Sequence, residues 1–345
     1  MSLTGGTLPA KVGSRAQDAR RRRLSIAATP KEYARSVMEE NERLREEGSE
    51  DRRREVLLCP DPHEEAVGLP VRWGYMSRPG NDPMKRVKEN QDTYIVLDRF
   101  AGRDDQLFVG VFDGHGPNGA KASRFVRDEL PTSWSTDHLA KEPFTVINKG
   151  CLATNQKLSV SDIDVYVSGT TGITTLIRGP KLYVANVGDS RAVLGRQFHD
   201  GSIAAVDLSR DHKPDDPEEM ARIVANGGRV FEWGVPRVWL RDVDMPGLAM
   251  ARSFGDLAAE TVGVFAEPEL SEVELSAADK FAIWASDGVW EFMTSQEVVD
   301  IVTANMDKGP TACCEAVVAE STKRWHQEED VVDDTTIVIT FFSFP

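Results

Sequence analysis

The sequence predicts an α+β fold built on antiparallel sheets. Short apolar and β-branched runs, separated by Gly, Asp and Asn, follow one another from 168 to 208, and this spacing is typical of hairpins. Two stretches with helical periodicity, 118–130 and 144–160, come in succession after the first strands. Paired helices argue against a regular alternation of strand and helix, so a parallel sheet is not expected.

The predicted elements follow from apolar runs and their punctuation. Apolar runs bounded by turn residues predict strands at 73–77, 92–97, 106–112, 173–177, 181–187, 192–195, 203–208, 280–285 and 335–342. Apolar residues at helical spacing predict helices at 118–130, 144–160, 217–226, 296–305 and 310–325. We expect Asp215 or Asp216 to begin the third helix and Ser295 to cap the fourth.

Residues 1–70 differ in composition from the rest of the chain. Small residues at the start give way to a basic run at 15–23 and then to a charged stretch of good helix formers at 30–54. We expect 1–70 to be an N-terminal extension, partly disordered, with one charged helix beginning near Pro30. The helix either lies on the main domain or is solvated. Residues 71–345 are expected to form a single globular domain.

Composition restricts the classes of partner. The 41 Lys and Arg residues against 56 Asp and Glu give a formal charge of -15, which argues against a general affinity for nucleic acid or anionic lipid. No apolar run approaches the length of a membrane span, and the four cysteines have neither zinc-site nor disulfide spacing. None of them is followed six positions later by Arg, as a thiol-dependent phosphatase loop requires. We expect a soluble protein of the cytoplasm or nucleus.

Carboxylates recur beside the ends of predicted strands. Asp92, Asp113, Asp189 and Asp287 stand at or next to strand ends, and Asp333 shortly precedes the last strand. Because antiparallel neighbours bring the end of one strand beside the start of the next, several of these residues could converge. Clustered carboxylates repel one another unless cations lie between them, and oxygen ligands favour Mg²⁺ or Mn²⁺ over zinc. The alternative is that each Asp serves only its own turn.

The loop after the strand at 106–112 carries a histidine as well. His115 lies between Gly114 and Gly116, which allow the backbone a sharp turn and a close approach to a ligand. Histidine is the side chain best suited to proton transfer near neutral pH. A hairpin loop in which Asp113 and His115 cap backbone groups is the alternative interpretation.

Eight motifs follow one another in the chain: ENQD (89–92), VFDGHG (111–116), SGTT (168–171), VANVGDSR (184–191), LSRDHKP (208–214), AMARSFGD (249–256), ASDGVWE (285–291) and DDTT (333–336). Together and in this order they resemble the motifs of the type 2C metal-dependent Ser/Thr protein phosphatases. The sequence of 238–252 is more similar to plant and protist members than to animal ones. The resemblance implies a four-layer αββα sandwich of two antiparallel β-sheets flanked by helices, with residues 71–345 as the catalytic domain.

The resemblance also implies an activity. The chain would hydrolyse phosphoserine and phosphothreonine in proteins, using a hydroxide that bridges two Mg²⁺ or Mn²⁺ ions and His115 as the general acid. Its partners would be phosphoprotein substrates, with no nucleic acid and no membrane span, and the chain would act as a monomer. The alternative is a catalytically silent relative that binds a partner through the same surface.

The metal ligands carried over by the resemblance come from five of the motifs. Asp113 would bridge the two ions, with the Gly114 carbonyl on one and Asp287 and Asp333 on the other, while Asp92 would act through water. Asp189 and Glu291 match the positions that hold a third ion in the family. Because Asp is usual where this chain has Glu291, the third ion stays open.

Phosphate binding is where the chain departs from the pattern. Many members carry Arg five residues before the Asp that matches Asp92, and this position is Val87 here. Arg86 and Lys88 flank it and are the candidates for phosphate binding, with Lys85 as a third. Residues 229–247, expected to be irregular with exposed Trp and Arg, look like the variable flap beside the family's active site; a packed surface loop is the alternative.

Overall fold

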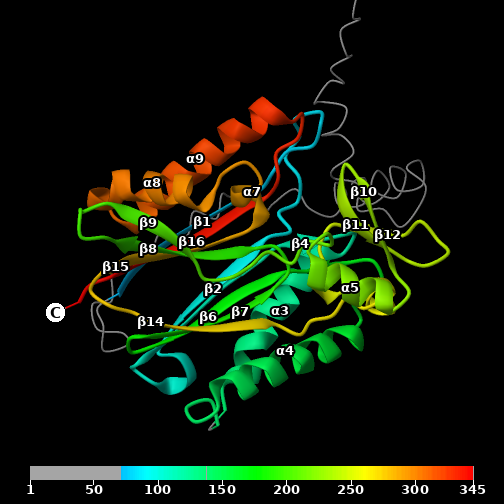
Figure 1. Ribbon diagram of the computed structural model, residues 1–345, viewed down its shortest axis with the longest axis horizontal. Coiled ribbons are helices and arrows are strands. Elements are labelled where there is room, and N and C mark those ends of the chain that lie inside the picture. Colours follow the sequence, from blue (N-terminus) through cyan, green and yellow to red (C-terminus); the bar gives the residue numbers. More distant parts are fainter. Residues whose placement is uncertain (1–70, 137, 345) are drawn as a thin grey trace, which may run out of the picture.

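The protein, described here from a computed structural model for residues 71–136 and 138–344, contains two antiparallel five-stranded sheets stacked face to face. Helices cover the outer face of each sheet, so the layers run helix, sheet, sheet, helix (Figure 1). This arrangement confirms the predicted fold class. The predictions for residues 1–70 lie outside the described residues.

The first sheet, called sheet I, has the strand order β1-β16-β15-β8-β9. Four of its strands were predicted within two residues at each end, and β16 matches its prediction at both ends. The bounds are β1 Val71–Arg78, β8 Arg191–Gln197, β9 Ile203–Asp207, β15 Asp279–Ala285 and β16 Thr335–Phe342.

The second sheet, called sheet II, has the order β14-β7-β6-β3-β2. Its edge strand β14 was not predicted, because its acidic residues give it no clear apolar run. The bounds are β2 Thr93–Asp98, β3 Gln106–Phe112, β6 Gly172–Arg178, β7 Lys181–Val187 and β14 Glu269–Glu274.

The central core lies between the two sheets and consists of their inward-facing side chains. Val109 and Ile173 from sheet II pack with Leu194 and Val338 from sheet I, all fully buried. Trp284 of β15 also crosses the core, and its Nε1 donates a hydrogen bond to Oγ1 of Thr175 in β6, 2.7 Å away. Burial of this much apolar surface is the main force that holds the layers together.

Helices α3 and α4 cover sheet II, and α8 and α9 cover sheet I. The expected cap of α8 was one residue off: Thr294, not Ser295, caps the helix, in a reciprocal capping box with Glu297. Asp216 is the cap of α5, as one of the two alternatives expected. The helix bounds are α3 Gly119–Trp134, α4 Pro143–Ser159, α5 Pro217–Ala225, α6 Leu257–Glu260, α7 Asp287–Trp290, α8 Ser295–Asn305 and α9 Pro310–Glu328, with short 3₁₀ helices η2 Phe100–Gly102 and η3 Met306–Lys308.

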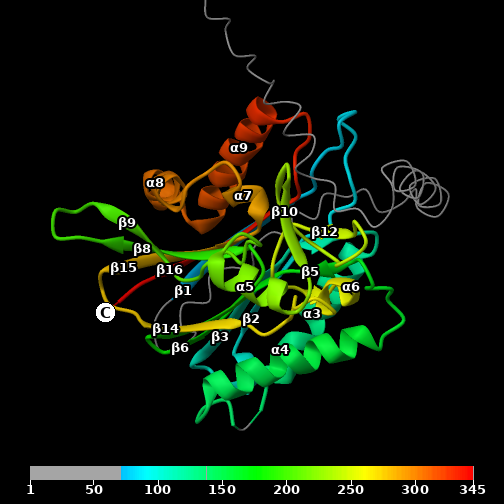
Figure 2. The ribbon, with the colours of Figure 1, turned by 45° about the vertical axis from the view of Figure 1, so that its right-hand side comes forward.

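The segment 229–247, expected to be irregular, forms most of a three-stranded antiparallel sheet beside α5 (Figure 2). Its strands are β10 Arg229–Trp233, β11 Val235–Trp239 and β12 Pro246–Leu248. The expectation of exposed Trp and Arg is wrong for Trp239 and Arg237, which are buried. Trp239 stacks between Phe231 and Trp233, and Arg237 donates to the carbonyl of Gly247, 2.7 Å away. The sequence shows no apolar alternation in this segment, and aromatic stacking stabilises its strands instead.

A second small sheet joins three distant segments near the end of β3. Its two-residue strands are β4 Gly114–His115, β5 Gly169–Thr170 and β13 Phe254–Gly255, in the order β13-β5-β4. Gly169 pairs with both His115 and Gly255. The motif at 111–116 therefore lies one strand away from the motif at 249–256. Of the helices described, none is both long and apolar enough to span a lipid bilayer.

Candidate metal and catalytic centre

Three of the predicted carboxylates lie at the same end of the strands of sheet II. The start of β2 lies beside the end of β3, because Thr93 pairs with Phe112, and the start of β6 lies beside the end of β7, because Gly172 pairs with Val187. Asp92 and Asp113 directly flank these strand ends, and Asp189 follows the end of β7 by two residues. Antiparallel pairing thus brings together residues that are far apart in the sequence, as expected.

The other two carboxylates come from sheet I. Asp287 begins α7 just after β15, and Asp333 shortly precedes β16, whose start is antiparallel to the end of β15. Ser286 joins this edge to sheet II: its Oγ donates to Oδ2 of Asp92 at 2.7 Å and accepts from the backbone N–H of Thr336 at 3.0 Å. The candidate centre therefore spans the seam between the two sheets.

Burial and neighbouring negative charge raise the pKa of two carboxylates of the cluster, Asp113 and Asp92. Burial raises the pKa of Asp113 well above its usual value, and the charges of Asp92, Asp287, Asp333 and Asp189 raise it further. Burial, followed by the charge of Asp334, does the same to the pKa of Asp92. Such a cluster is costly unless positive charge is supplied.

The donor set fits a hard divalent cation. One carboxylate oxygen each of Asp92 and Asp189 is buried and accepts no hydrogen bond from the described residues. The donors are oxygens, the ligands that Mg²⁺ and Mn²⁺ prefer. Within 71–136 and 138–344, no three Asp, Glu, His or Cys side chains converge closely enough to enclose an ion by themselves. Mg²⁺ usually keeps several waters and few protein ligands, which agrees with this looser cluster.

Backbone contacts fix the loop that carries Asp113 and Gly114. The N–H of Asp113 donates to Oγ1 of Thr171 at 3.0 Å, and its carbonyl accepts from the N–H of Thr171 at 2.9 Å. A Cβ at Gly114 would collide with the carbonyl oxygens of Gly119 and Gln91. Glycine is therefore required at 114 for close packing, since no side chain fits there.

His115 makes a short contact that the sequence did not predict. Its Nε2 lies 2.6 Å from Oδ2 of Asp256, which is almost completely buried. Burial alone lowers the pKa of His115, but the charge and hydrogen bond of Asp256 raise it above the usual value. The sequence interpretation placed Asp256 only in a buried loop network, because nothing in its spacing links it to His115.

Asp189, the candidate for a third ion, has a cationic partner within the chain. Oδ2 of Asp189 lies 2.5 Å from Nζ of Lys213, in the motif at 208–214. Burial opposes the charge of Lys213, but Asp189 and Asp287 raise the pKa of its ammonium above the usual value. Glu291, the other candidate, directly follows α7, and its N–H donates to the carbonyl of Asp287 at 2.8 Å.

The candidates for phosphate binding differ in their surroundings. Nζ of Lys88 lies 2.9 Å from Oδ1 of Asp333, at the edge of the carboxylate cluster. The guanidinium of Arg86 instead binds Asp82 at 2.6 to 2.7 Å, in an exposed loop. Lys85, in the same loop, has a left-handed backbone with φ of 60°. Lys88 is the candidate that lies at the carboxylate cluster.

A charged network behind the centre anchors α5. Glu219 of α5 is buried and accepts from Arg252 at 2.6 Å, and it also binds Arg222 at 2.6 Å. Burial tends to raise the pKa of Glu219, but Arg252 and Arg222 hold it below the usual value. A buried carboxylate between two guanidiniums is strongly held, because removal of one partner leaves uncompensated charge.

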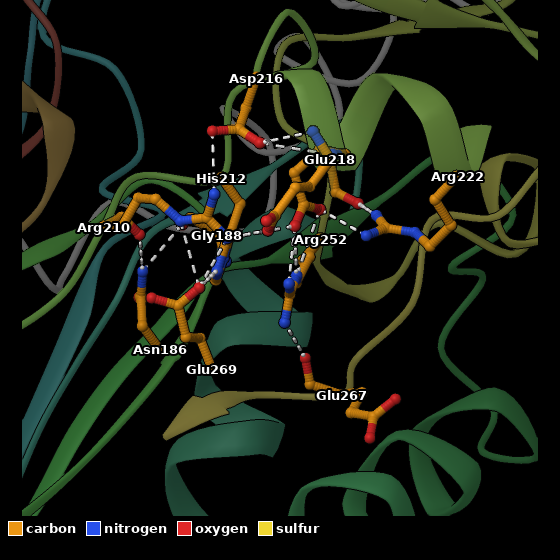
Figure 3. Close-up of polar contacts among 12 residues, drawn as sticks. Asn186, Gly188, Arg210, His212, Asp216, Glu218, Arg222, Arg252, Glu267 and Glu269 are labelled. Carbon is orange, nitrogen blue, oxygen red and sulfur yellow. Dashed lines mark hydrogen bonds and ion pairs between the residues drawn. The ribbon is translucent and has the colours of Figure 1, made fainter. Parts of the chain in front are cut away.

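The same network reaches the loop of Asp189 through a buried histidine. Nδ1 of His212 accepts from the N–H of Gly188 at 3.1 Å, and Nε2 lies 3.6 Å from a carboxylate oxygen of Glu269 (Figure 3). Burial lowers the pKa of His212, so the neutral ring with hydrogen on Nε2 fits both contacts. The interpretation of His212 as a structural residue agrees with this position.

Comparison with known proteins identifies a family. Residues 80–330 match the family model described as Protein phosphatase 2C. The chain is 40% identical over 306 residues to the Probable protein phosphatase 2C 35 of Arabidopsis thaliana, covering 82% of this chain and 86% of that protein. It is 39% identical over 317 residues to the Probable protein phosphatase 2C 64 of Oryza sativa subsp. japonica, covering 86% and 74%.

The fold has solved counterparts as well. The crystal structure of a serine-threonine phosphatase 2C from Toxoplasma gondii superimposes with a TM-score of 0.69 at 22% sequence identity, covering 80% of this chain and 95% of that one. At this level of identity, the likeness supports the fold alone.

Proposed function

The chain belongs to the protein phosphatase 2C family, a family of metal-dependent Ser/Thr protein phosphatases, and on that premise we propose how its residues carry out the reaction. The substrates would be phosphoserine and phosphothreonine side chains of proteins. The observation that carries the proposal is the convergence of five carboxylates at the seam of two sheets, with His115 beside them.

Two ions would be held by residues from both sheets. Asp113 would lie between them, with the Gly114 carbonyl on one ion, Asp287 and Asp333 on the other, and Asp92 acting through water. A third ion would fall to Asp189 and Glu291. Bound there, Mg²⁺ or Mn²⁺ would neutralise phosphate charge and lower the pKa of a water, so that hydroxide would be available as the nucleophile near neutral pH.

Side chains of the protein would bind the phosphate and protonate the leaving group. Lys88, at the rim of the cluster beside Asp333, would bind a phosphate oxygen by a charge-assisted hydrogen bond. His115 would give a proton to the leaving serine or threonine oxygen as the bond to phosphorus breaks. That proton matters because an alkoxide is a poor leaving group.

Turnover of a phosphothreonine peptide by the purified full chain tests this proposal. We expect hydrolysis with Mn²⁺ and none after chelation, and we expect Asp287→Asn to abolish turnover without changing the circular dichroism spectrum. Absence of chelator-sensitive turnover in the wild type would favour the alternative, a catalytically silent binding protein. Wild-type turnover in Asp287→Asn would show that the ligand assignment is wrong.

A further inference from the structure

The backbone and the carboxylate of Asp256 are held in place by contacts with β5 and the residue before it. Its backbone adopts a left-handed conformation with φ of 51°, which costs free energy in a residue other than glycine. Its N–H donates to the carbonyl of Ser168 at 2.9 Å, and a Cβ at Gly169 would collide with its carboxylate. The fold therefore holds this carboxylate in one place, against β5.

The hydrogen bond to His115 decides where the ring keeps its first proton. An ionised carboxylate only accepts hydrogen bonds, so Nε2 of His115 must carry hydrogen to bind Oδ2 at 2.6 Å. Nδ1 is then the ring nitrogen that Asp256 does not bind. Nδ1 is buried and has no hydrogen-bond partner among the described residues. This nitrogen is the one that is left for a substrate oxygen.

We propose that Asp256 is a positioning residue, which fixes the ring of His115 with hydrogen on Nε2 so that Nδ1 is the atom that protonates the leaving group. The inference rests on the proposed function and names the atoms of its acid step. Nδ1–H passes its proton to the serine or threonine oxygen as the P–O bond to that oxygen breaks. The electron pair of the broken bond stays on the leaving oxygen, and His115 is left neutral with hydrogen on Nε2.

The structure offers a matched control for replacing a buried aspartate. Asp279, at the start of β15, is fully buried and binds Arg196 at 2.6 Å. It stands at the end of β15 opposite Ala285 and the candidate centre. Asp279→Asn therefore reports what the loss of a buried carboxylate does to the fold without touching His115.

The leaving group provides the discriminating measurement. Turnover is compared between a phosphothreonine peptide, whose leaving oxygen needs a proton, and p-nitrophenyl phosphate, whose leaving group does not. In Asp256→Asn we expect kcat on the peptide to fall about 10²-fold or more, within the range of general acid–base catalysis, with little change on the aryl phosphate. Asp279→Asn should leave the ratio of the two rates as in the wild type.

His115→Gln should show the same dependence on leaving group, and the double variant with Asp256→Asn should be no slower than His115→Gln alone, because the two residues act as a unit. An equal fall on both substrates in Asp256→Asn would overturn the positioning role. Failure of the wild type to hydrolyse either substrate would instead count against the proposed function.

The nitrogen spectrum of the histidine ring tests the inference without turnover. In ¹⁵N-labelled protein, His115 should carry hydrogen on Nε2 in the wild type, and Asp256→Asn and Asp256→Ser should shift it toward Nδ1. Two variants are used so that a folding defect in one does not decide the result. A ring with hydrogen on Nδ1 alone in the wild type, or an unchanged spectrum in both variants, would contradict the proposal.

Discussion

Lys213 places its ammonium 2.5 Å from Oδ2 of Asp189, so one of the two candidate ligands for a third ion already has a positive partner. The partner comes from the motif at 208–214, whereas Asp189 follows β7. A tethered cation differs from a free one because it cannot be removed by chelation.

Replacing Lys213 with Gln should strengthen the binding of Mn²⁺. The change frees Oδ2 of Asp189 and makes the cluster more negative; we expect affinity to rise roughly tenfold, which corresponds to about 1.4 kcal/mol. Isothermal titration calorimetry measures it. Lys181→Gln is the control, since Lys181 binds Glu272 at the same distance but on the surface. Unchanged or weaker binding in Lys213→Gln would contradict the prediction.

Lys88→Ala should impair the capture of phosphate. At saturating Mn²⁺ we expect KM for a phosphopeptide to rise ten- to hundredfold, because a hydrogen bond to a charged group contributes about 1.5 to 3 kcal/mol. Arg86→Ala should have little effect, since Arg86 binds Asp82 in an exposed loop. If Arg86→Ala had the larger effect on KM, the assignment of Lys88 would be wrong.

Glu219→Ala should destabilise the protein. The change leaves Arg252 and Arg222 without their shared carboxylate, and loss of one partner of a buried ion pair costs about 3 to 5 kcal/mol. Urea unfolding measures it. The neighbouring Glu218 makes an ideal comparison, since its side chain is 80% exposed while that of Glu219 is 1% exposed. Equal losses in Glu218→Ala and Glu219→Ala would disprove the special role of Glu219.

Glu269→Gln should reduce the fall in the free energy of unfolding at low pH. His212 and then Arg210 lower the pKa of Glu269 to about 2, below its value of 4.5 in the unfolded chain. The carboxylate therefore contributes stability that is complete above pH 4.5 and is lost as the pH falls toward about 2. Urea unfolding over this range should show a smaller decline in the variant. Glu274→Gln, an exposed change in the same strand, should follow the wild type.

Most strands of the two large sheets could be predicted because each strand is marked by its own local sequence. β3, β7 and β16 are apolar runs closed by turn residues, and their bounds agree with the prediction at both ends. β10 to β12 could not, because they are short, include Pro236 and Pro246, and depend on the stacking of Trp239 rather than on alternation.

The candidate site divides in the same way. Convergence of the carboxylates follows from antiparallel pairing, which a list of strands already implies. The contact between His115 and Asp256 does not follow, because it depends on three two-residue strands that only the folded chain brings together. The choice between Arg86 and Lys88 depends on the conformation of one loop, which the sequence does not predict.

Because the candidate centre lies at the seam, it can form only after the two sheets have docked. Asp113 follows a strand of one sheet and Asp287 follows a strand of the other, so neither half of the sandwich has the complete set of proposed ligands. A chain whose sheets have not docked in register can hold secondary structure but cannot gather these carboxylates. Acquisition of the ions would then be a late event in folding, and an unfinished molecule would be kept from acting on phosphoproteins.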